Sequence, residues 1–395
     1  MNTPNFLSTK FLQNYVNKKV PFTELGEFVY LRTYSRFLEQ EGRREKWEET
    51  IKRAIEYNIG LETRFNPEAN VDALRKEAEE LFENMFHLRQ FPSGRTLWVG
   101  GTPVADLFPI SNFNCSFLVM DSFEGFCEQF YLLMIGSGVG FRTMPYDVEK
   151  IPSFRTGVKL TSKDYRPVPK KYRREFTSLK VEGDKAIIIV GDSKEGWITA
   201  LDLYFKLLTS FLYKNVKHII VNFDNVRGKG ERLARFGGTS SGHTSLKTMF
   251  EKIHKVMMRT EGKLQPIDAL DIGNIIAENV VSGGVRRSSE INLASKDDMD
   301  IENAKNGMYY QDENGEWVEN KEILHRRMSN NSIFYEDKPT REELHQNFIN
   351  MRYTGERGFV NAKAGRKRRK DFAGMNPCAK ILAHVNHRVK SVTAK

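Results

Sequence analysis

The sequence predicts an α/β protein with parallel strands, preceded by a helical module. Two apolar runs with the composition of buried strands occur at 186–190 and 218–221. Two amphipathic helices are expected at 246–260 and 266–279, before a further strand at 290–293. Strands that alternate with helices are typical of α/β folds, which bind ligands at glycine-rich loops beside the strand ends.

Composition and charge set the first limits on function. The chain has 395 residues, of which 39% are hydrophobic and 28% are charged, as in an ordinary globular protein. No apolar run has membrane-spanning length, and the N-terminus does not resemble a signal peptide. Three cysteines without zinc-ligand spacing indicate neither a disulfide scaffold nor a metal site, and suit a reducing cytoplasm. The net charge of +10 favours polyanions, which leaves nucleic acid and nucleotide phosphates both open.

Residues 1–88 are expected to form the helical module. Residues 22–58 carry apolar side chains at helical spacing, among them Phe28 and Leu31. A second amphipathic helix is expected at 71–87. The charged residues of this module are interpreted as a solvated face, and none of them indicates catalysis.

Residues 89–378 are expected to form the α/β part. A loop-rich run at 91–102 predicts tight turns where backbone N–H groups can face a ligand. Cys115 follows in an alternating, strand-like pattern, and an apolar helix is expected over 123–135. Cys127 lies in that helix with apolar neighbours one turn away, so it is interpreted as a core residue.

A glycine run follows the apolar helix. Gly136, Gly138 and Gly140 look like a phosphate loop, but their spacing is not that of the dinucleotide-binding fingerprint. A helix stop and a sharp turn explain them better. Residues 147–184 then combine many lysines and arginines with tyrosines. This mixture fits contact with nucleic acid, contact with an anionic nucleotide, or a solvated surface.

A proline-fixed turn lies near the end of the chain. Pro377 fixes its own φ angle and disfavours the α region for Asn376, so the turn that ends in Cys378 is expected to be rigid. Such a turn can hold a thiol and a carboxamide on one side of a cleft. The alternative is a cysteine buried in a loop, and the distant Cys115 favours the cleft.

Eight short motifs, taken together, resemble one protein family. Each motif is weak alone, but eight in the family's order are highly specific. They are Arg-Thr-Leu-Trp at 95–98, Asn-Phe-Asn-Cys at 112–115, Gly-Ser-Gly-Val-Gly-Phe at 136–141, Asp-Ser-Lys-Glu-Gly-Trp at 192–197, Asn-Val-Arg at 225–227, Phe-Gly-Gly-Thr at 236–239, Gly-Val-Arg-Arg-Ser at 284–288 and Asn-Pro-Cys at 376–378. From about residue 22 to residue 378, the chain resembles the monomeric, adenosylcobalamin-dependent (class II) ribonucleoside-triphosphate reductases.

The resemblance implies a fold and a chemistry. The fold is a ten-stranded α/β barrel with a finger loop, of which residues 89–378 would be the N-terminal part. Cys378 matches the thiyl-radical cysteine of that loop, and Asn376 matches the residue that holds the substrate's hydroxyls. Cys115 matches one of the two cysteines that reduce the ribose. A sulfur radical can abstract the 3′ hydrogen, while a thiol pair supplies two electrons and protons as the 2′ hydroxyl leaves as water.

The resemblance also implies partners. The cofactor would be adenosylcobalamin, the substrate a ribonucleoside triphosphate and the reductant thioredoxin or a similar dithiol. A deoxynucleotide (dNTP) effector is expected near Gly136, Gly138 and Gly140 and at the loop 282–289, which matches the segment that couples the effector to the substrate base. The candidate residues of that loop are Ser282, Gly283, Gly284, Arg286, Arg287 and Ser288.

The end of the chain departs from the family pattern. The family has a glutamate two residues after the cysteine, where this chain has Lys380, and no cysteine follows Cys378. Residues 379–395 match nothing in the family and are expected to be an unrelated basic tail. We expect an interrupted gene (an intron, a frameshift or an intein) and a chain that is inactive until splicing or a separate chain restores the second half of the barrel. The alternative function is a non-catalytic module that binds nucleotides or nucleic acid.

Overall fold

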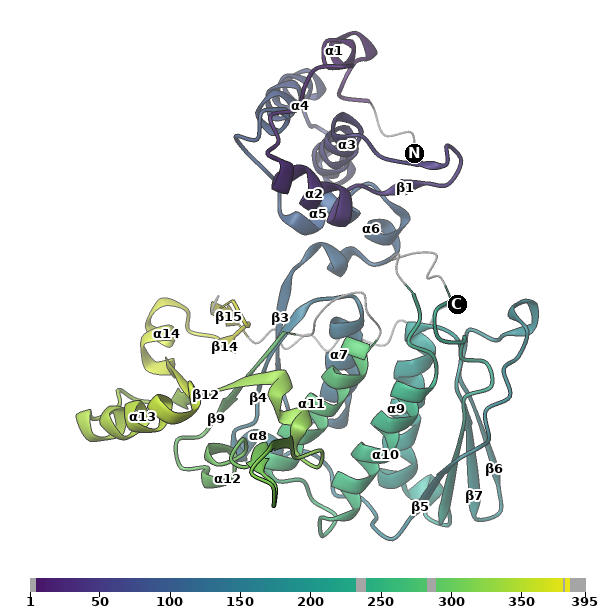
Figure 1. Cartoon of the computed structure of the whole chain (residues 1–395), viewed down its shortest axis with the longest axis vertical. Helices are drawn as coiled ribbons and strands as arrows, with labels where there is room; N and C mark the ends of the chain where they lie inside the picture. Colours follow the sequence, from purple (N-terminus) through teal and green to yellow (C-terminus); the bar gives the residue numbers. More distant parts are fainter. Residues whose placement is uncertain (1–4, 232–238, 283–288, 379–380, 384–395) are drawn as a thin grey trace. The chain divides into compact units, whose positions relative to one another are not determined.

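The chain forms two compact units, residues 1–114 and residues 115–395. The sequence predicts a domain boundary between residues 88 and 89. Contacts in the structure instead place residues 89–114 in the first unit. Figure 1 shows the elements of each unit in colours that follow the sequence. The computed structural model describes residues 5–231, 239–282, 289–378 and 381–383.

The first unit is helical and has a core of its own. Its two long helices, α3 (Trp47–Phe65) and α4 (Val71–Phe86), pack against each other and bury residues such as Ile51 and Phe82. Asn70 caps α4, which confirms the helix predicted at 71–87. The other elements are α1 (Thr9–Gln13), α2 (Glu24–Thr33), β1 (Phe37–Leu38), β2 (Arg43–Arg44), α5 (Gly94–Val99), α6 (Pro103–Leu107) and the 3-10 turn η1 (Pro109–Asn112).

The helical structure predicted over 22–58 is confirmed for α2 and for the part of α3 up to residue 58, and it is wrong between them. The hairpin of β1 and β2 separates α2 from α3, and Gly42, with a φ of +65°, allows its turn. The apolar spacing in α2 also misleads, because Phe28 is 56% and Leu31 42% exposed, whereas Tyr30 is buried. Local periodicity therefore predicted helical structure but missed the turn and the buried face.

The second unit is built on a parallel sheet of five strands. The strand order is β13-β12-β9-β4-β3, and every neighbouring pair is parallel, which confirms the predicted α/β class. The bounds are β3 (Cys115–Val119), β4 (Gly138–Arg142), β9 (Glu290–Ala294), β12 (Ser329–Tyr335) and β13 (Gly358–Asn361).

A second sheet has the order β5-β8-β7-β6. Its pairs are parallel except for the antiparallel pair of β6 and β7. Strands β7 and β8 are those predicted from apolar runs, and the basic segment 147–184 supplies β5 and β6. The bounds are β5 (Lys159–Ser162), β6 (Ser178–Glu182), β7 (Lys185–Ile189) and β8 (His218–Asn222), with short 3-10 turns η2 (Lys170–Tyr172) and η3 (Phe211–Tyr213).

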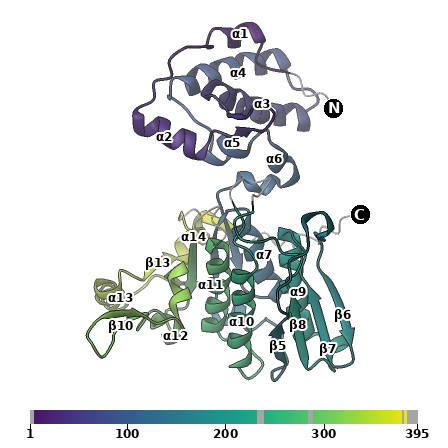
Figure 2. The same ribbon diagram turned by 45° about the vertical axis from the view of Figure 1, so that its right-hand side comes forward.

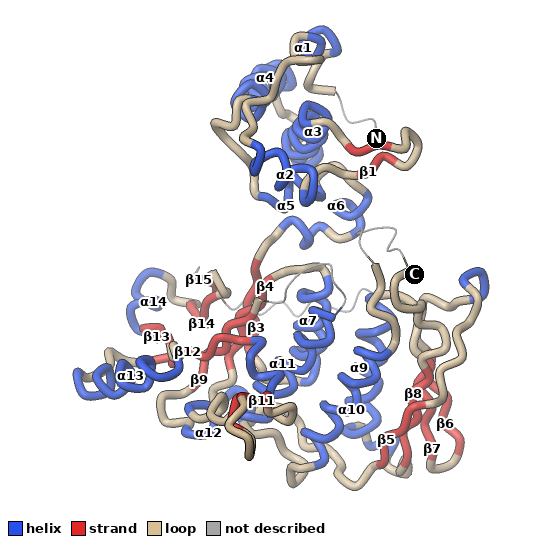
Figure 3. Tube along the Cα trace, in the orientation of Figure 1, coloured by secondary structure: helices blue, strands red, loops and turns tan. Residues whose placement is uncertain are grey.

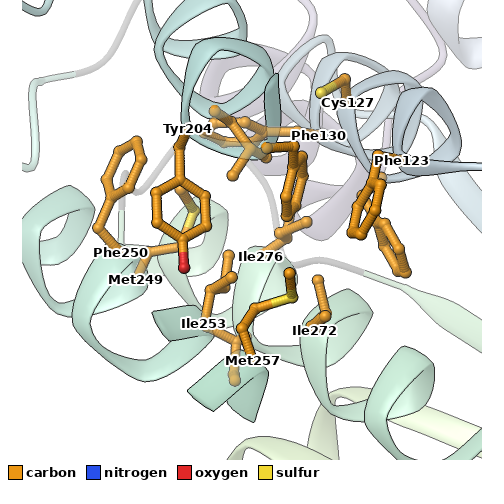
Figure 4. Close-up of a cluster of buried hydrophobic side chains, with 14 of the residues drawn as sticks. Phe123, Cys127, Phe130, Tyr204, Met249, Phe250, Ile253, Met257, Ile272 and Ile276 are labelled. Carbon is orange, nitrogen blue, oxygen red and sulfur yellow. The ribbon is translucent and has the colours of Figure 1, made fainter. Parts of the chain in front are cut away.

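Helices of the second unit lie between its two sheets (Figures 1 and 2), and Figure 3 shows them in blue between two groups of red strands. Apolar side chains from these helices form one core, part of which Figure 4 shows, with Phe130, Tyr204 and Ile276 pointing toward one another. Cys127 is 8% exposed there, as predicted for a core residue. The helices are α7 (Phe123–Met134), α9 (Lys194–Thr209), α10 (Thr244–Met258) and α11 (Pro266–Ser282).

The opposite face of the five-stranded sheet is covered by β14 (Phe372–Met375), which pairs with β15 in an antiparallel ladder. None of the described helices is both long enough and apolar enough to cross a membrane. The remaining elements are α8 (Pro145–Val148), α12 (Met299–Glu302), the hairpin of β10 (Tyr309–Gln311) and β11 (Trp317–Glu319), η4 (Leu324–Met328), α13 (Arg341–Thr354), α14 (Ala362–Arg368) and β15 (Ile381–Ala383).

A buried carboxyl group joins β9 to the helix layer. Glu290 is 3% exposed, and its Oε1 accepts a hydrogen bond of 2.5 Å from Nε2 of Gln129 on α7. Among the described residues, Oε2 of Glu290 and Oε1 of Gln129 have no partner. Burial raises the pKa of Glu290 well above its ordinary value. A proton on the carboxyl group would provide the donor that this acid–amide pair lacks.

We predict that Glu290→Gln makes the chain more stable at pH 8 but changes little near pH 4. Since the folded-state pKa of Glu290 is raised, its protonated form contributes stability below the ordinary pKa of 4.5, and this contribution is lost as pH rises through the folded-state pKa. Each unit by which the folded-state pKa exceeds the unfolded-state pKa corresponds to about 1.4 kcal/mol in the free energy of unfolding. Urea unfolding of the parent chain and the variant between these pH values measures the difference.

Asp271→Asn provides a control of opposite sign. Burial acts against ionisation of Asp271, but hydrogen bonds from Arg326 and His325 hold its pKa well below the ordinary value. This contribution is present at neutral pH and lost in acid, so the destabilisation by Asp271→Asn should shrink as pH falls. A difference between Glu290→Gln and the parent chain that is the same at every pH would contradict the proposed protonation.

Candidate active site

The turn that carries Cys378 follows directly after β14. Asn376 is 2% exposed, Pro377 is half-buried and Cys378 is exposed. A proline at the centre of the turn fixes the backbone between the carboxamide and the thiol. Asn376 is therefore buried beside an exposed Cys378, and the alternative of a buried Cys378 is wrong.

The turn brings two distant thiols together. Sγ of Cys378 lies 3.3 Å from Sγ of Cys115, although 263 positions separate them in the sequence. Cys115 is half-buried at the start of β3. A disulfide bond is about 2.05 Å long, so no disulfide joins the two sulfurs in this structure. Cys127 is not part of the pair, and burial raises the pKa of its thiol well above the ordinary value.

Two glycines of β4 form the surface on which the turn rests. A Cβ at Gly140 would lie 2.0 Å from the carbonyl oxygen of Met375, a distance that no side chain permits. A Cβ at Gly138 would lie 3.4 Å from Cγ of Pro377 and 3.6 Å from Sγ of Cys115. Both residues lie in a strand, so the sharp turn predicted for the glycine run holds only for Gly136, which has a φ of +80°.

A third contact extends this series along β4. Nη1 of Arg142 donates a hydrogen bond of 2.8 Å to the carbonyl oxygen of Ala373. Positions 138, 140 and 142 of β4 therefore meet positions 377, 375 and 373 of the crossing segment. Alternate residues of a strand share one face, so the segment runs over a single face of β4 in the opposite direction.

The sequence offered a weak signal for Arg142. An arginine at the end of a glycine-rich, apolar strand is unusual, and Asp147 follows five positions later. Those two side chains form an ion pair with N–O distances of 2.7 and 3.0 Å. The contact with Ala373 depends on how β14 crosses the sheet, and no local pattern contains that information.

The predicted effector loop is described only at its margins. Ser282 is the last residue of α11, whereas Gly283, Gly284, Arg286, Arg287, Ser288 and Lys380 lie outside the described residues. The carbonyl oxygen of Ser289 accepts a hydrogen bond of 2.9 Å from the backbone of Val139. The loop therefore returns to the sheet one residue away from Gly138.

Some basic residues of the segment 147–184 form ion pairs within their own unit, whereas others, such as Lys170 and Lys171, are exposed. Arg173 lies 2.8 Å from Glu231 and 3.6 Å from Asp192, and Lys163 lies 3.0 Å from Asp224. No group of three or more His, Cys, Asp or Glu side chains in the described part of the chain is arranged to hold a metal ion.

Two family models match separate parts of the chain. Residues 7–102 match the model described as "Ribonucleotide reductase alpha domain", and residues 158–257 match "B12-dependent ribonucleotide reductase, insertion domain". The second match covers the four-stranded sheet with α9 and most of α10. The resemblance that the short motifs indicate is thereby confirmed.

Curated relatives and a solved structure agree with these models. The adenosylcobalamin-dependent ribonucleoside-triphosphate reductase of Lactobacillus leichmannii is 30% identical over 426 residues, which cover 95% of this chain and 55% of the relative. That of Lactobacillus gasseri is 32% identical over 413 residues, which cover 91% and 53%. A crystal structure of a B12-dependent (class II) ribonucleotide reductase matches with a TM-score of 0.80 and 28% identity over 95% of this chain and 56% of that chain.

The chain thus spans about half the length of the curated relatives it matches. Its sequence motifs, its parallel sheet and both domain matches point to the same proteins. Over nearly all of its length, the chain is therefore similar to the N-terminal half of B12-dependent, class II ribonucleotide reductases.

Proposed function

We propose that the chain supplies the thiol-bearing half of an enzyme that reduces ribonucleoside triphosphates to 2′-deoxyribonucleoside triphosphates, as its relatives are named to do. The observation that carries the proposal is the pair of sulfur atoms of Cys115 and Cys378, 3.3 Å apart. A binding module has no need of two thiols held together from opposite ends of its fold. Reduction of a ribose requires thiols that can give electrons at one place.

In this proposal the two cysteines have different roles. Cys378, on the exposed turn, is the sulfur that takes the 3′ hydrogen of the ribose and returns it at the end. Cys115 is one of two thiols that together give two electrons and two protons, so that the 2′ hydroxyl leaves as water and the two sulfurs join in a disulfide. The second reducing thiol comes from residues beyond this chain, because Cys127 is enclosed in the helix layer. Asn376 is placed to hold the ribose hydroxyls.

The proposed cofactor is adenosylcobalamin, which needs a cavity that reaches the reacting thiol. The relatives are named adenosylcobalamin-dependent, and we propose the same dependence for the complete enzyme. Cavities of about 550 and 330 Å³ occur in the first and second units, and neither is lined by Cys115 or Cys378. Neither of these two cavities is therefore a corrin site beside the thiol pair.

The proposed enzyme also needs an effector and a source of electrons. A deoxynucleotide effector would bind near Gly136 and the loop 282–289, whose end lies beside Gly138 through Ser289. Thioredoxin or a similar dithiol would reduce the enzyme after each turnover. Since the thiols must be returned to the reduced form, the cytoplasm is the compartment that suits the reaction.

The first prediction from this proposal concerns the thiol pair. Treating the folded chain with oxidised glutathione should convert Cys115 and Cys378 together into one intramolecular disulfide, with release of two glutathione molecules, because their sulfurs already lie 3.3 Å apart. Cys127 should stay reduced because it is buried. Peptide mapping by mass spectrometry measures the outcome, and Cys127→Ser is the matched control. Separate glutathione adducts on Cys115 and Cys378 would contradict the pairing.

A second prediction concerns turnover. In an enzyme assembled from this chain and the remaining half of the family's sequence, Cys378→Ser should lower deoxynucleotide formation by a factor on the order of a thousand or more, because an oxygen radical is costlier to form than a sulfur radical. Cys127→Ser should leave the rate within about twofold. Deoxynucleotides separated by chromatography in the presence of adenosylcobalamin and dithiothreitol measure the rate. Equal rates for the Cys378→Ser and unmodified enzymes would exclude Cys378 as the reacting thiol.

A third prediction separates nucleotide binding from nucleic-acid binding. The chain should bind a deoxynucleoside triphosphate more weakly as salt rises, and Arg286→Ala or Arg287→Ala should weaken it further by about tenfold, roughly the value of a charge-assisted hydrogen bond. Lys163→Ala, which removes a cation already paired with Asp224, is the control. Equilibrium dialysis with labelled dNTP measures affinity. Salt-dependent binding of random oligonucleotides without dNTP binding would support the alternative function instead.

A further inference from the structure

The position of β14 on the sheet needs an explanation, because its backbone hydrogen bonds lead elsewhere. Among the described strands, β14 makes its ladder with β15 and not with the sheet that it covers. The contacts between β14 and the sheet at Gly140 and Gly374 are close approaches that glycine permits. Such close contact leaves no room for a side chain. Van der Waals attraction between the two backbones is weak and does not by itself fix the position of β14 along β4. A directional contact must fix where β14 stops along β4.

Arg142 provides that directional contact. Its Nη1 donates to the carbonyl oxygen of Ala373 at 2.8 Å, within β14. Its Nε and Nη2 donate to the two carboxylate oxygens of Asp147, so all three nitrogens of the planar guanidinium group have an acceptor. Arg142 is 8% and Asp147 1% exposed. Such a buried, bidentate pair has one geometry, and its remaining N–H groups point in fixed directions.

Aromatic rings hold the guanidinium from its sides. Its central carbon lies 5.3 Å from the ring centre of Phe334 and 5.4 Å from that of Tyr146. Phe334 also stacks on Phe372, the first residue of β14, with ring centres 6.1 Å apart. The same ring therefore contacts both Arg142 and β14, which makes the link between them stiffer than a single hydrogen bond.

The link extends from Arg142 to the thiol. Ala373 and Cys378 are joined by a short segment in which Met375 rests on Gly140 and Asn376 is buried. Cys115 is placed by the parallel ladder that pairs it with Gly138. Both thiols are thus located relative to one strand, β4: Cys115 through backbone hydrogen bonds, and Cys378 through the side chain of Arg142.

We propose that Arg142, held by Asp147, is a positioning residue that sets the distance between the sulfurs of Cys115 and Cys378. The inference rests on the proposed function for its significance, but its test needs neither substrate nor turnover. A lysine at position 142 keeps the charge and loses the planar fork, so it cannot hold Asp147 in two places while donating to Ala373. The register of β14 then relaxes while the sheet beneath it remains.

The experiment compares Arg142→Lys with a matched control, Arg155→Lys. Arg155 also donates to backbone carbonyl groups, those of Val216 and Tyr213, in a part of the second unit remote in sequence from β14. Two quantities are measured on the folded chain: the rate at which oxidised glutathione forms the Cys115–Cys378 disulfide, and hydrogen exchange of the amides at 372–376. Thermal unfolding of each variant shows any general loss of stability.

We expect Arg142→Lys to slow disulfide formation by about tenfold or more, which is the range of one charge-assisted hydrogen bond, and to speed exchange in β14. Arg155→Lys should change neither quantity, even where it lowers the unfolding temperature equally. Asp147→Asn should act in the same direction as Arg142→Lys, and the two effects should not add, because they disturb one contact.

The proposal is overturned if Arg142→Lys forms the disulfide at the parent rate with unchanged exchange in β14. If Arg142→Lys does not fold, the same two measurements on Asp147→Asn decide in its place. If the parent chain itself forms no Cys115–Cys378 disulfide, the thiol pairing in the proposed function fails. Exchange at 372–376 then still decides whether Arg142 holds β14.

Discussion

The candidate site depends on the close approach of two backbones at Gly140. A Cβ at this position would lie 2.0 Å from the carbonyl oxygen of Met375, so any other residue would force the crossing segment off the sheet. The turn that follows Met375 carries Cys378, and the strand beside β4 begins with Cys115. The absence of a side chain in the middle of a strand, which ordinarily weakens it, is thus what allows the two thiols to meet.

Strand β4 serves different purposes on its two faces. Val139 and Phe141 are fully buried against the helix layer, where they contribute to the main core of the second unit. Gly138, Gly140 and Arg142 face the crossing segment. Because side chains alternate along a strand, the core that stabilises the sheet and the contacts that place the thiols are carried by separate sets of residues. Changes on one face can therefore alter the site without removing the core.

Sequence patterns predicted the elements whose signals are local. The apolar runs gave β7 and β8, the apolar helix gave α7 with Cys127 in the core, and the motifs brought Cys115 and Cys378 into one hypothesis. The hairpin before α3 was missed because Phe37 and Leu38 continue the helical spacing of the residues before them, although Phe37 is exposed. The roles of Gly140 and Arg142 could not be predicted, since both depend on which distant backbone crosses β4, and a strand's own residues do not identify its neighbours.

Part of the positive charge around the second sheet is balanced by acidic side chains within the fold. Asp192 lies 3.0 Å from Arg227 and 3.6 Å from Arg173, and Arg173 also pairs with Glu231, so these arginines balance buried or half-buried acids. Other basic side chains of the segment 147–184, among them Lys170, Lys171 and Arg174, face solvent, where they can meet a polyanion. The thiols of Cys115 and Cys378, in contrast, do not stabilise the fold, because neither the sheet nor the helix layer needs them to be in contact. Their juxtaposition requires three separate contacts along β4, and the proposed chemistry of both thiols on one substrate explains it better than stability does.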